Sequence, residues 1–213
     1  MPLGAVGDWS GLIGPPRPTG ALCDHERVRR PLLALALACL LSGCASETTT
    51  VSEVGTPASP QEAAVEWVER TPAQGPALVF HVHRLAVTET GWRAELEIRN
   101  ETSVAWELGT DPIAVARSFG IMLFATGELA EVEKRGADGD LPGLRSARRF
   151  DPRLPDRLDP RERWRGTVAA DGALAADRYL RVVFGPLVAR SDPPDDLPEQ
   201  FVWITDHAYE LRP

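Results

Sequence analysis

The chain has 213 residues, of which 43% are hydrophobic, 25% charged and 7% aromatic, and its formal net charge is −8. This composition excludes a collagen, a coiled coil and a wholly disordered chain. The acidic charge argues against a protein that binds nucleic acid, because such a protein needs a basic face to neutralise phosphates. We therefore expect one or two folded domains and no nucleic-acid partner.

A basic and then apolar segment near the start of the sequence is typical of a targeting signal. Arg27, Arg29 and Arg30 precede residues 32–41, an uncharged run that continues into Ser42-Gly43-Cys44. A bilayer-spanning helix takes about 20 apolar residues, so this run is too short to span and fits the apolar region of a signal peptide. In this order the features resemble the lipobox and type II signal peptide of bacterial lipoprotein precursors.

The lipoprotein resemblance implies a membrane anchor. Residues 1–43 would be removed as the signal peptide, and Cys44 would carry fatty acyl chains such as palmitate that hold the protein to a membrane outside the cytoplasm. Ala45 after the cysteine is similar to lipoproteins sent to the outer membrane, if the cell has one; otherwise we expect the outer face of the cell membrane. Residues 1–26 lack a signal pattern, so a later translation start near Val28 stays open as an alternative.

Residues 44–76 are predicted to be a lipidated tether with one short helix. Residues 45–60 are rich in Ser, Thr, Glu and Pro, which is typical of a flexible linker. The helix is predicted over residues 60–70, because Ser59 can cap it and Pro60 suits its first position. The alternative is a strand that runs through Val65, Trp67 and Glu69.

Residues 77–213 alternate between apolar and polar side chains, as the strands of an antiparallel sheet do. In the clearest strand, Trp92, Ala94, Leu96 and Ile98 lie on one face and charged residues on the other, after a turn at residues 88–91. Further strands are predicted near residues 78–83, 104–108, 120–125, 164–170, 179–184, 201–205 and 209–211. The pattern predicts an all-β fold, an antiparallel β-sandwich of seven or eight strands, with residues 126–163 as a long loop.

Two sequence features resemble the small immunoglobulin-like domains of exported bacterial proteins. One is the polar strand end Arg99-Asn100-Glu101-Thr102-Ser103, and the other is Leu158-Asp159-Pro160 before Trp164-Arg165-Gly166-Thr167. The resemblance implies an immunoglobulin-like sandwich that binds or presents other molecules. We also expect Asn100 to end its strand in an Asx-turn, although Asn100-Glu101-Thr102 matches a glycosylation sequon.

His81 and His83 are the pair of side chains whose spacing best suits metal binding. On a strand they share one face, about 6–7 Å apart along the chain, and such a pair can bind one metal ion if a third ligand arrives. His207, beside Asp206 near the last strand, is the candidate third ligand. The alternative is a pair of solvent-facing histidines on an edge strand.

A cluster of arginines marks the predicted long loop. The candidates for binding an anion or a partner are Arg145, Arg148, Arg149 and Arg153. The alternative is a solvated loop whose local ion pairs contribute little.

Motifs of common enzyme classes are missing, including a nucleophile elbow, a zinc-protease helix, a phosphate loop and a dinucleotide fingerprint. We therefore predict a protein that is not an enzyme and has no cofactor. The expected function is a lipid-anchored cell-envelope binding or scaffolding module with an envelope protein or polymer as its partner. The alternative is an envelope metal-binding protein that uses His81, His83 and His207.

Overall fold

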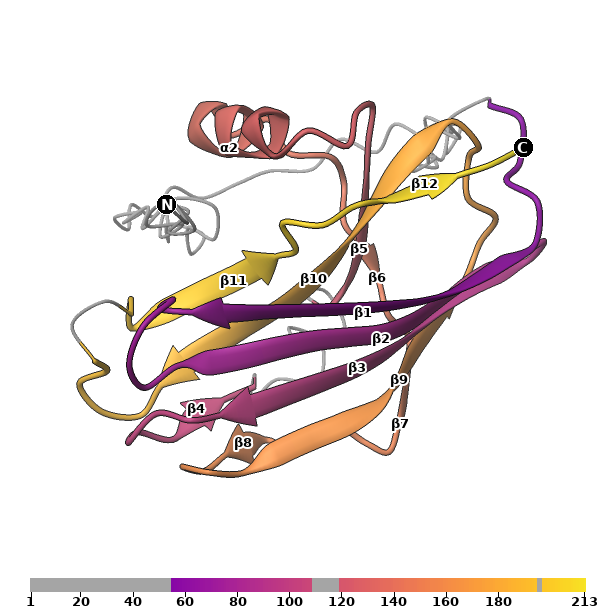
Figure 1. Ribbon diagram of the computed structural model, residues 1–213. Helices are drawn as coiled ribbons and strands as arrows, with labels where there is room; N and C mark the ends of the chain where they lie inside the picture. Colours follow the sequence, from indigo (N-terminus) through magenta and orange to yellow (C-terminus); the bar gives the residue numbers. More distant parts are fainter. Residues whose placement is uncertain (1–54, 109–118, 195–196) are drawn as a thin grey trace, which may run out of the picture. The chain divides into compact units, whose positions relative to one another are not determined.

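The computed structural model of the chain describes residues 55–108, 119–194 and 197–213. The predicted signal peptide of residues 1–43, the lipidation site Cys44 and most of the predicted linker lie outside the described residues. The described residues form two antiparallel sheets that pack face to face as a β-sandwich (Figure 1), which confirms the predicted fold class. No helix in these three ranges is long and apolar enough to cross a membrane.

The first sheet has five strands and lies in front in Figure 1. Its order across the sheet is β1 (Gln61–Thr71), β2 (Leu78–Thr88), β3 (Gly91–Asn100), β9 (Arg163–Asp171) and β7 (Arg149–Asp151). Each neighbouring pair is antiparallel. Strand β1 is therefore one edge of this sheet.

The second sheet is built around the long strand β10 (Arg178–Ala189). Its partners are β5 (Gly120–Phe124), β4 (Trp106–Glu107), β11 (Gln200–Ile204) and β12 (Tyr209–Leu211). Two short strands extend it, because β6 (Arg145–Ser146) pairs with β5 and β8 (Arg157–Leu158) pairs with β4. This sheet closes the back of the sandwich.

Aromatic side chains from both sheets meet in the core. Phe80 on β2 contacts Phe184 on β10 with ring centroids 5.0 Å apart, and it stacks on Trp203 of β11 at 5.4 Å. Four tryptophans are buried in this core: Trp92, Trp106, Trp164 and Trp203. Burial of such large apolar surfaces is the main source of stability in a domain of this size.

Strand β1 corrects one prediction, because residues 60–70 do not form a helix. From Gln61 to Thr71 the more buried side chains occur at every second residue, and the backbone pairs with β2 on both sides of one β-bulge. The alternative through Val65, Trp67 and Glu69 is the one that the structure adopts. The sandwich therefore begins at Gln61, within the segment that was predicted to be a tether.

The segment of residues 126–163 is also more ordered than the predicted long loop. It contains a helix, α2 (Leu129–Asp138), and three short strands, β6, β7 and β8. The helix ends where Gly139 adopts a left-handed conformation with φ 71°. Buried Val132, Ala147, Leu154 and Leu158 fix this segment to the sandwich, so the described residues form more strands than the seven or eight predicted.

Asn100 ends β3 as predicted, and it also joins the two sheets. Its side-chain oxygen accepts the backbone N–H of Thr102 at 3.0 Å, which is an Asx-turn. Its amide donates to the carbonyls of Val104 at 2.8 Å and Leu158 at 3.0 Å. Because Asn100 is fully buried, the sequon at this position has a structural role in the folded domain.

Candidate metal centre

Two β-bulges occur at the same level of the first sheet. Between Ala64 and Trp67, β1 carries one residue more than β2, and between Val82 and Arg84, β2 carries one residue more than β3. Glu66 sits in the first bulge with φ 47°, a left-handed conformation that a side chain with a Cβ rarely adopts. The bulges change which side chains meet on the outer face of the sheet.

The bulge in β2 brings the two histidines together. Their ring centroids lie 3.6 Å apart and the ring planes are inclined by 39°, which is closer than the about 6–7 Å expected along a regular strand. His81 and His83 thus lie side by side on the outer face, as the sequence predicts.

Glu66 completes a group of three potential ligands. Its Oε2 atom lies 2.8 Å from Nε2 of His81 and 3.3 Å from Nδ1 of His83. One ligand atom from each of the three residues lies within 4.8 Å of the other two. Among the described residues, Glu66, His81 and His83 form the group of His, Cys, Asp or Glu side chains that could hold a metal ion. An imidazole, a second imidazole and a carboxylate therefore face one point.

The three side chains differ in exposure. The imidazoles of His81 and His83 are only 19% and 11% exposed, whereas the carboxylate of Glu66 is 61% exposed. Partial desolvation raises the pKa of Glu66, but hydrogen bonds with His83 and His81 outweigh it, so the pKa lies below its ordinary value. The site thus holds its ionised carboxylate at an opening to solvent.

Glu97 lies behind His83. Its Oε2 atom is 3.5 Å from Nε2 of His83, and its side chain is only 10% exposed. This differs from the alternation in the sequence, which places Glu97 on the wet face, because His83 and Arg99 pack beside it. Nε2 of His83 is itself buried and has no hydrogen-bond partner among the described residues.

The structure does not bring His207 to this group. His207 stacks on Trp67 with ring centroids 5.5 Å apart, and its Nδ1 lies 2.8 Å from Oε1 of Glu69. Glu69 is buried and also accepts hydrogen bonds from Trp203 and from the backbone of Asp206. His207 thus joins β1 to the end of β11, and Glu66 occupies the place predicted for it.

Sequence reasoning missed Glu66 for a physical reason. The strand alternative through Val65, Trp67 and Glu69 puts Glu66 on the opposite, outward face, and this was the only available signal. Its position opposite both histidines depends on the two bulges, and a register shift between strands leaves no periodic mark in either strand.

The four candidate arginines do not converge. Arg145 lies on β6 of the second sheet, whereas Arg149 lies on β7 of the first. Arg149 makes a bidentate ion pair with Asp171 at 2.9 and 3.0 Å, and Arg153 lies 3.7 Å from Asp156. Arg148 is exposed between the two short strands. These arginines are spread over both sheets, and two of them are paired with acidic groups of the same chain.

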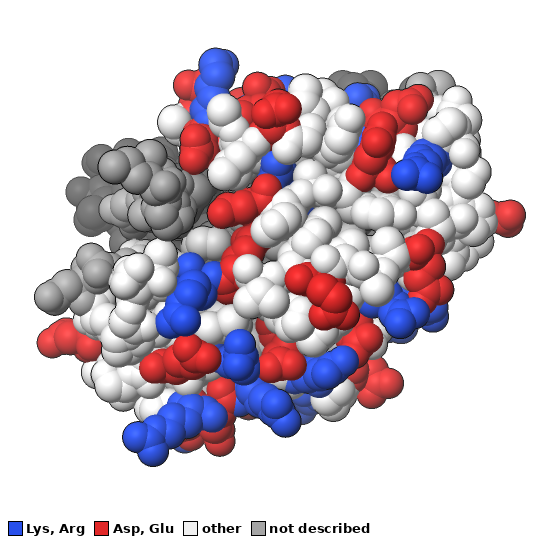
Figure 2. All heavy atoms as spheres, viewed as in Figure 1, with Lys and Arg blue, Asp and Glu red and all other residues white. Residues whose placement is uncertain are grey.

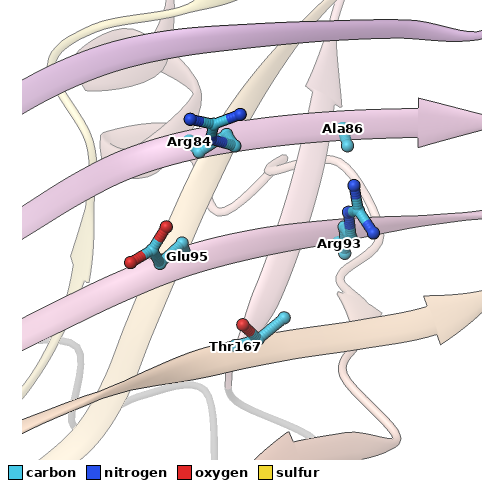
Figure 3. Close-up of a pocket in the computed structure, with 5 residues that line it drawn as sticks. All are labelled: Arg84, Ala86, Arg93, Glu95 and Thr167. Carbon is cyan, nitrogen blue, oxygen red and sulfur yellow. The ribbon is translucent and has the colours of Figure 1, made fainter.

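The outer face of the first sheet carries charges of both signs, as Figure 2 shows. A hollow on this face is lined by Arg84, Ala86, Arg93, Glu95 and Thr167 (Figure 3). Glu62 lies 2.8 Å from Arg84 and 3.6 Å from Arg93, and Arg165 pairs with Glu95. The charges around the hollow are thus paired with oppositely charged side chains of the same sheet, whereas the carboxylate of Glu66 pairs with two imidazoles.

Comparison with protein families, curated proteins and solved structures found no match for the chain. The likeness to immunoglobulin-like domains and to bacterial lipoproteins therefore stays a prediction.

Proposed function

We propose that the protein is a lipid-anchored cell-envelope β-sandwich that binds one divalent transition-metal ion, with zinc as the best fit, through Glu66, His81 and His83. The observation that carries this proposal is the convergence of these three ligand atoms within 4.8 Å of one another. Glu66, and not His207, is the third ligand in this proposal.

The spacing of the ligand atoms supports a tetrahedral ion. Zinc binds nitrogen and oxygen ligands at about 2.0–2.1 Å, so neighbouring ligands of a tetrahedral site lie roughly 3.3 Å apart. Oε2 of Glu66 lies 2.8 Å and 3.3 Å from the two imidazole nitrogens. Both distances from Glu66 are therefore close to the spacing of neighbouring ligands in a tetrahedral site.

The donor set supports a choice among metals. Calcium and magnesium prefer oxygen ligands and copper(I) prefers sulfur, whereas two imidazoles and a carboxylate suit zinc and its neighbours. Three protein ligands leave one tetrahedral position for water or another ligand. Because the carboxylate of Glu66 is largely exposed, we propose that solvent would reach the ion and that the ion would be exchangeable.

A competing explanation is that Glu66 only pairs with protonated histidines to hold β1 against β2. Metal titration separates the two explanations, because an ion pair needs no metal. The experiment uses the full chain, purified without a histidine tag and freed of metal by a chelator, with zinc binding measured by isothermal titration calorimetry.

We expect the unchanged chain to bind one equivalent of zinc. His81→Ala and His83→Ala should each weaken binding at least roughly 100-fold, because loss of a direct ligand costs more than loss of a supporting residue. His207→Ala is the matched control, since it also removes one imidazole beside a carboxylate, and it should bind as the unchanged chain does. Less than about a tenth of an equivalent bound by the unchanged chain, or equal losses in His207→Ala and His81→Ala, would overturn the proposal.

A further inference from the structure

The two ring nitrogens of a metal-binding histidine have separate partners. When one nitrogen binds the ion, the other usually donates its N–H to a carboxylate or carbonyl, which fixes the tautomer and the ring orientation. In the proposed site, Nδ1 of His83 faces Glu66. His83 therefore needs an acceptor for the proton on its Nε2 atom, a requirement that rests on the proposed function.

Nε2 of His83 lies in a buried position beside the carboxylate of Glu97. It has no hydrogen-bond partner among the described residues, and Oε2 of Glu97 is 3.5 Å away. A buried polar atom without a partner loses its hydrogen bonds to water and gains none in return, so natural proteins seldom leave one unpaired. A small closure of this gap would make a charge-assisted hydrogen bond.

The surroundings of Glu97 aim its carboxylate at His83. Glu97 lies in the middle of β3, where it is paired across the strands with His81 on β2 and with Arg165 on β9. Its Oε1 atom lies 3.5 Å from Nε of Arg99, which leaves Oε2 for His83. The carboxylate is thus held between two strands and is only 10% exposed.

We infer that Glu97 is a positioning residue for the metal site: it accepts the Nε2 proton of His83 and so directs the Nδ1 lone pair at the ion. Glu66, His81 and His83 are the ligands, and Glu97 acts through His83 without touching the metal. The ion at Nδ1 and the hydrogen bond at Nε2 strengthen each other, because a carboxylate partner makes the imidazole a better donor to a cation.

The test is Glu97→Gln in the full chain, with Glu95→Gln as the matched control. Glu95 lies two residues away on the same strand and the same face, but its partner is Arg165. Zinc affinity should fall about 10–100-fold in Glu97→Gln and stay within about threefold in Glu95→Gln. A glutamine amide can point its NH₂ group at Nε2, which favours the wrong tautomer of His83.

A second readout separates positioning from a merely structural role. In zinc-loaded unchanged protein, the Nε2 proton of His83 should appear in the NMR spectrum as a downfield, slowly exchanging signal. In Glu97→Gln that signal should move upfield or disappear through exchange with water, whereas the imidazole N–H signal of His81 should keep its position. A global loss of structure would move both signals together and contradict the inference.

The outcomes distinguish the inference from the proposed function. If the unchanged chain fails to bind zinc, the proposed function itself is wrong. If the unchanged chain binds zinc and Glu97→Gln binds it equally well with an unchanged His83 signal, only the positioning role of Glu97 is wrong.

Discussion

The pKa of the Asp206 carboxyl is raised in the folded chain. Its backbone N–H donates to Oε1 of Glu69 at 2.8 Å, and its carbonyl accepts from the buried guanidinium of Arg181. Burial is the largest cause that raises the pKa of the Asp206 carboxyl, and the nearby Glu69 raises it further, against smaller opposing effects of His207 and Arg181. The carboxyl of Asp206 thus loses its proton at a higher pH in the folded chain than in the unfolded chain.

This shift predicts a pH-dependent difference between the chain and Asp206→Asn. A raised pKa in the folded state gives stability that is fully present below the unfolded value, about 3.9, and is lost as pH rises through the folded value. Asparagine cannot ionise, so the variant escapes that loss. We expect equal stability near pH 3 and a more stable variant at pH 7, measured by urea unfolding. A variant less stable than the unchanged chain at pH 7 would contradict the assignment.

Single residues were predictable where the cause is local. The Asx-turn at Asn100 follows from its own side chain and the next two residues, and the structure contains it. Glu97 was placed on the wet face by alternation, yet it is buried, because side chains from a neighbouring strand and from its own strand cover it. The sequence of one strand does not contain that information.

At the scale of elements, the bulge in edge strand β1 gives Glu66 two opposite effects, one on the stability of the fold and one on metal binding. Glu66 has φ 47°, and a residue with a Cβ costs about 1–2 kcal/mol in the left-handed region, where glycine adopts the conformation without that penalty. The side chain of Glu66 contributes hydrogen bonds to both histidines at a largely exposed position. The backbone conformation of Glu66 thus lowers the stability of the fold, whereas its carboxylate is needed for the proposed metal site.

Glu66→Gly tests this separation. We expect the metal-free variant to unfold within about 1 kcal/mol of the unchanged chain, because relief of backbone strain offsets the lost surface contacts. Zinc binding should be lost, since only two ligands remain. Denaturant unfolding and zinc titration give the two readouts. A variant that still binds zinc at the original affinity would remove Glu66 from the ligand set.

Elements were predictable where their own periodicity decides them. Strand β9 alternates strongly, and β2, β3, β9 and β10 each appear where the sequence predicts a strand. Strand β1 was predicted as a helix because Ala64, Trp67 and Val68 also fit helical spacing; the pairing with β2 decides between the two. The bulges that build the candidate site depend on the register of three strands and could not be predicted.

At the scale of the whole molecule, the candidate site and the core are separate. Glu66, His81 and His83 lie outside the buried core cluster, on the outer face of the first sheet. Changes to these side chains should therefore spare the fold. The same separation would let an anchored domain present its metal ion to the surrounding solution.

The anchor is a separate prediction, since Cys44 lies outside the described residues. We expect the unchanged protein to incorporate a clickable palmitate analogue and to sediment with membranes. Cys44→Ser should lose the label and leave the membrane fraction, because stable attachment depends on two or more acyl chains. An unlabelled protein, or a Cys44→Ser variant bound just as firmly, would contradict the lipoprotein assignment without affecting the metal site.

The most direct test of the central claim is anomalous scattering at the zinc edge from crystals of the zinc-loaded full chain. The account predicts one strong peak within bonding distance, about 2.1 Å, of Oε2 of Glu66, Nε2 of His81 and Nδ1 of His83. A peak at His207, or no peak between these three atoms, would contradict it.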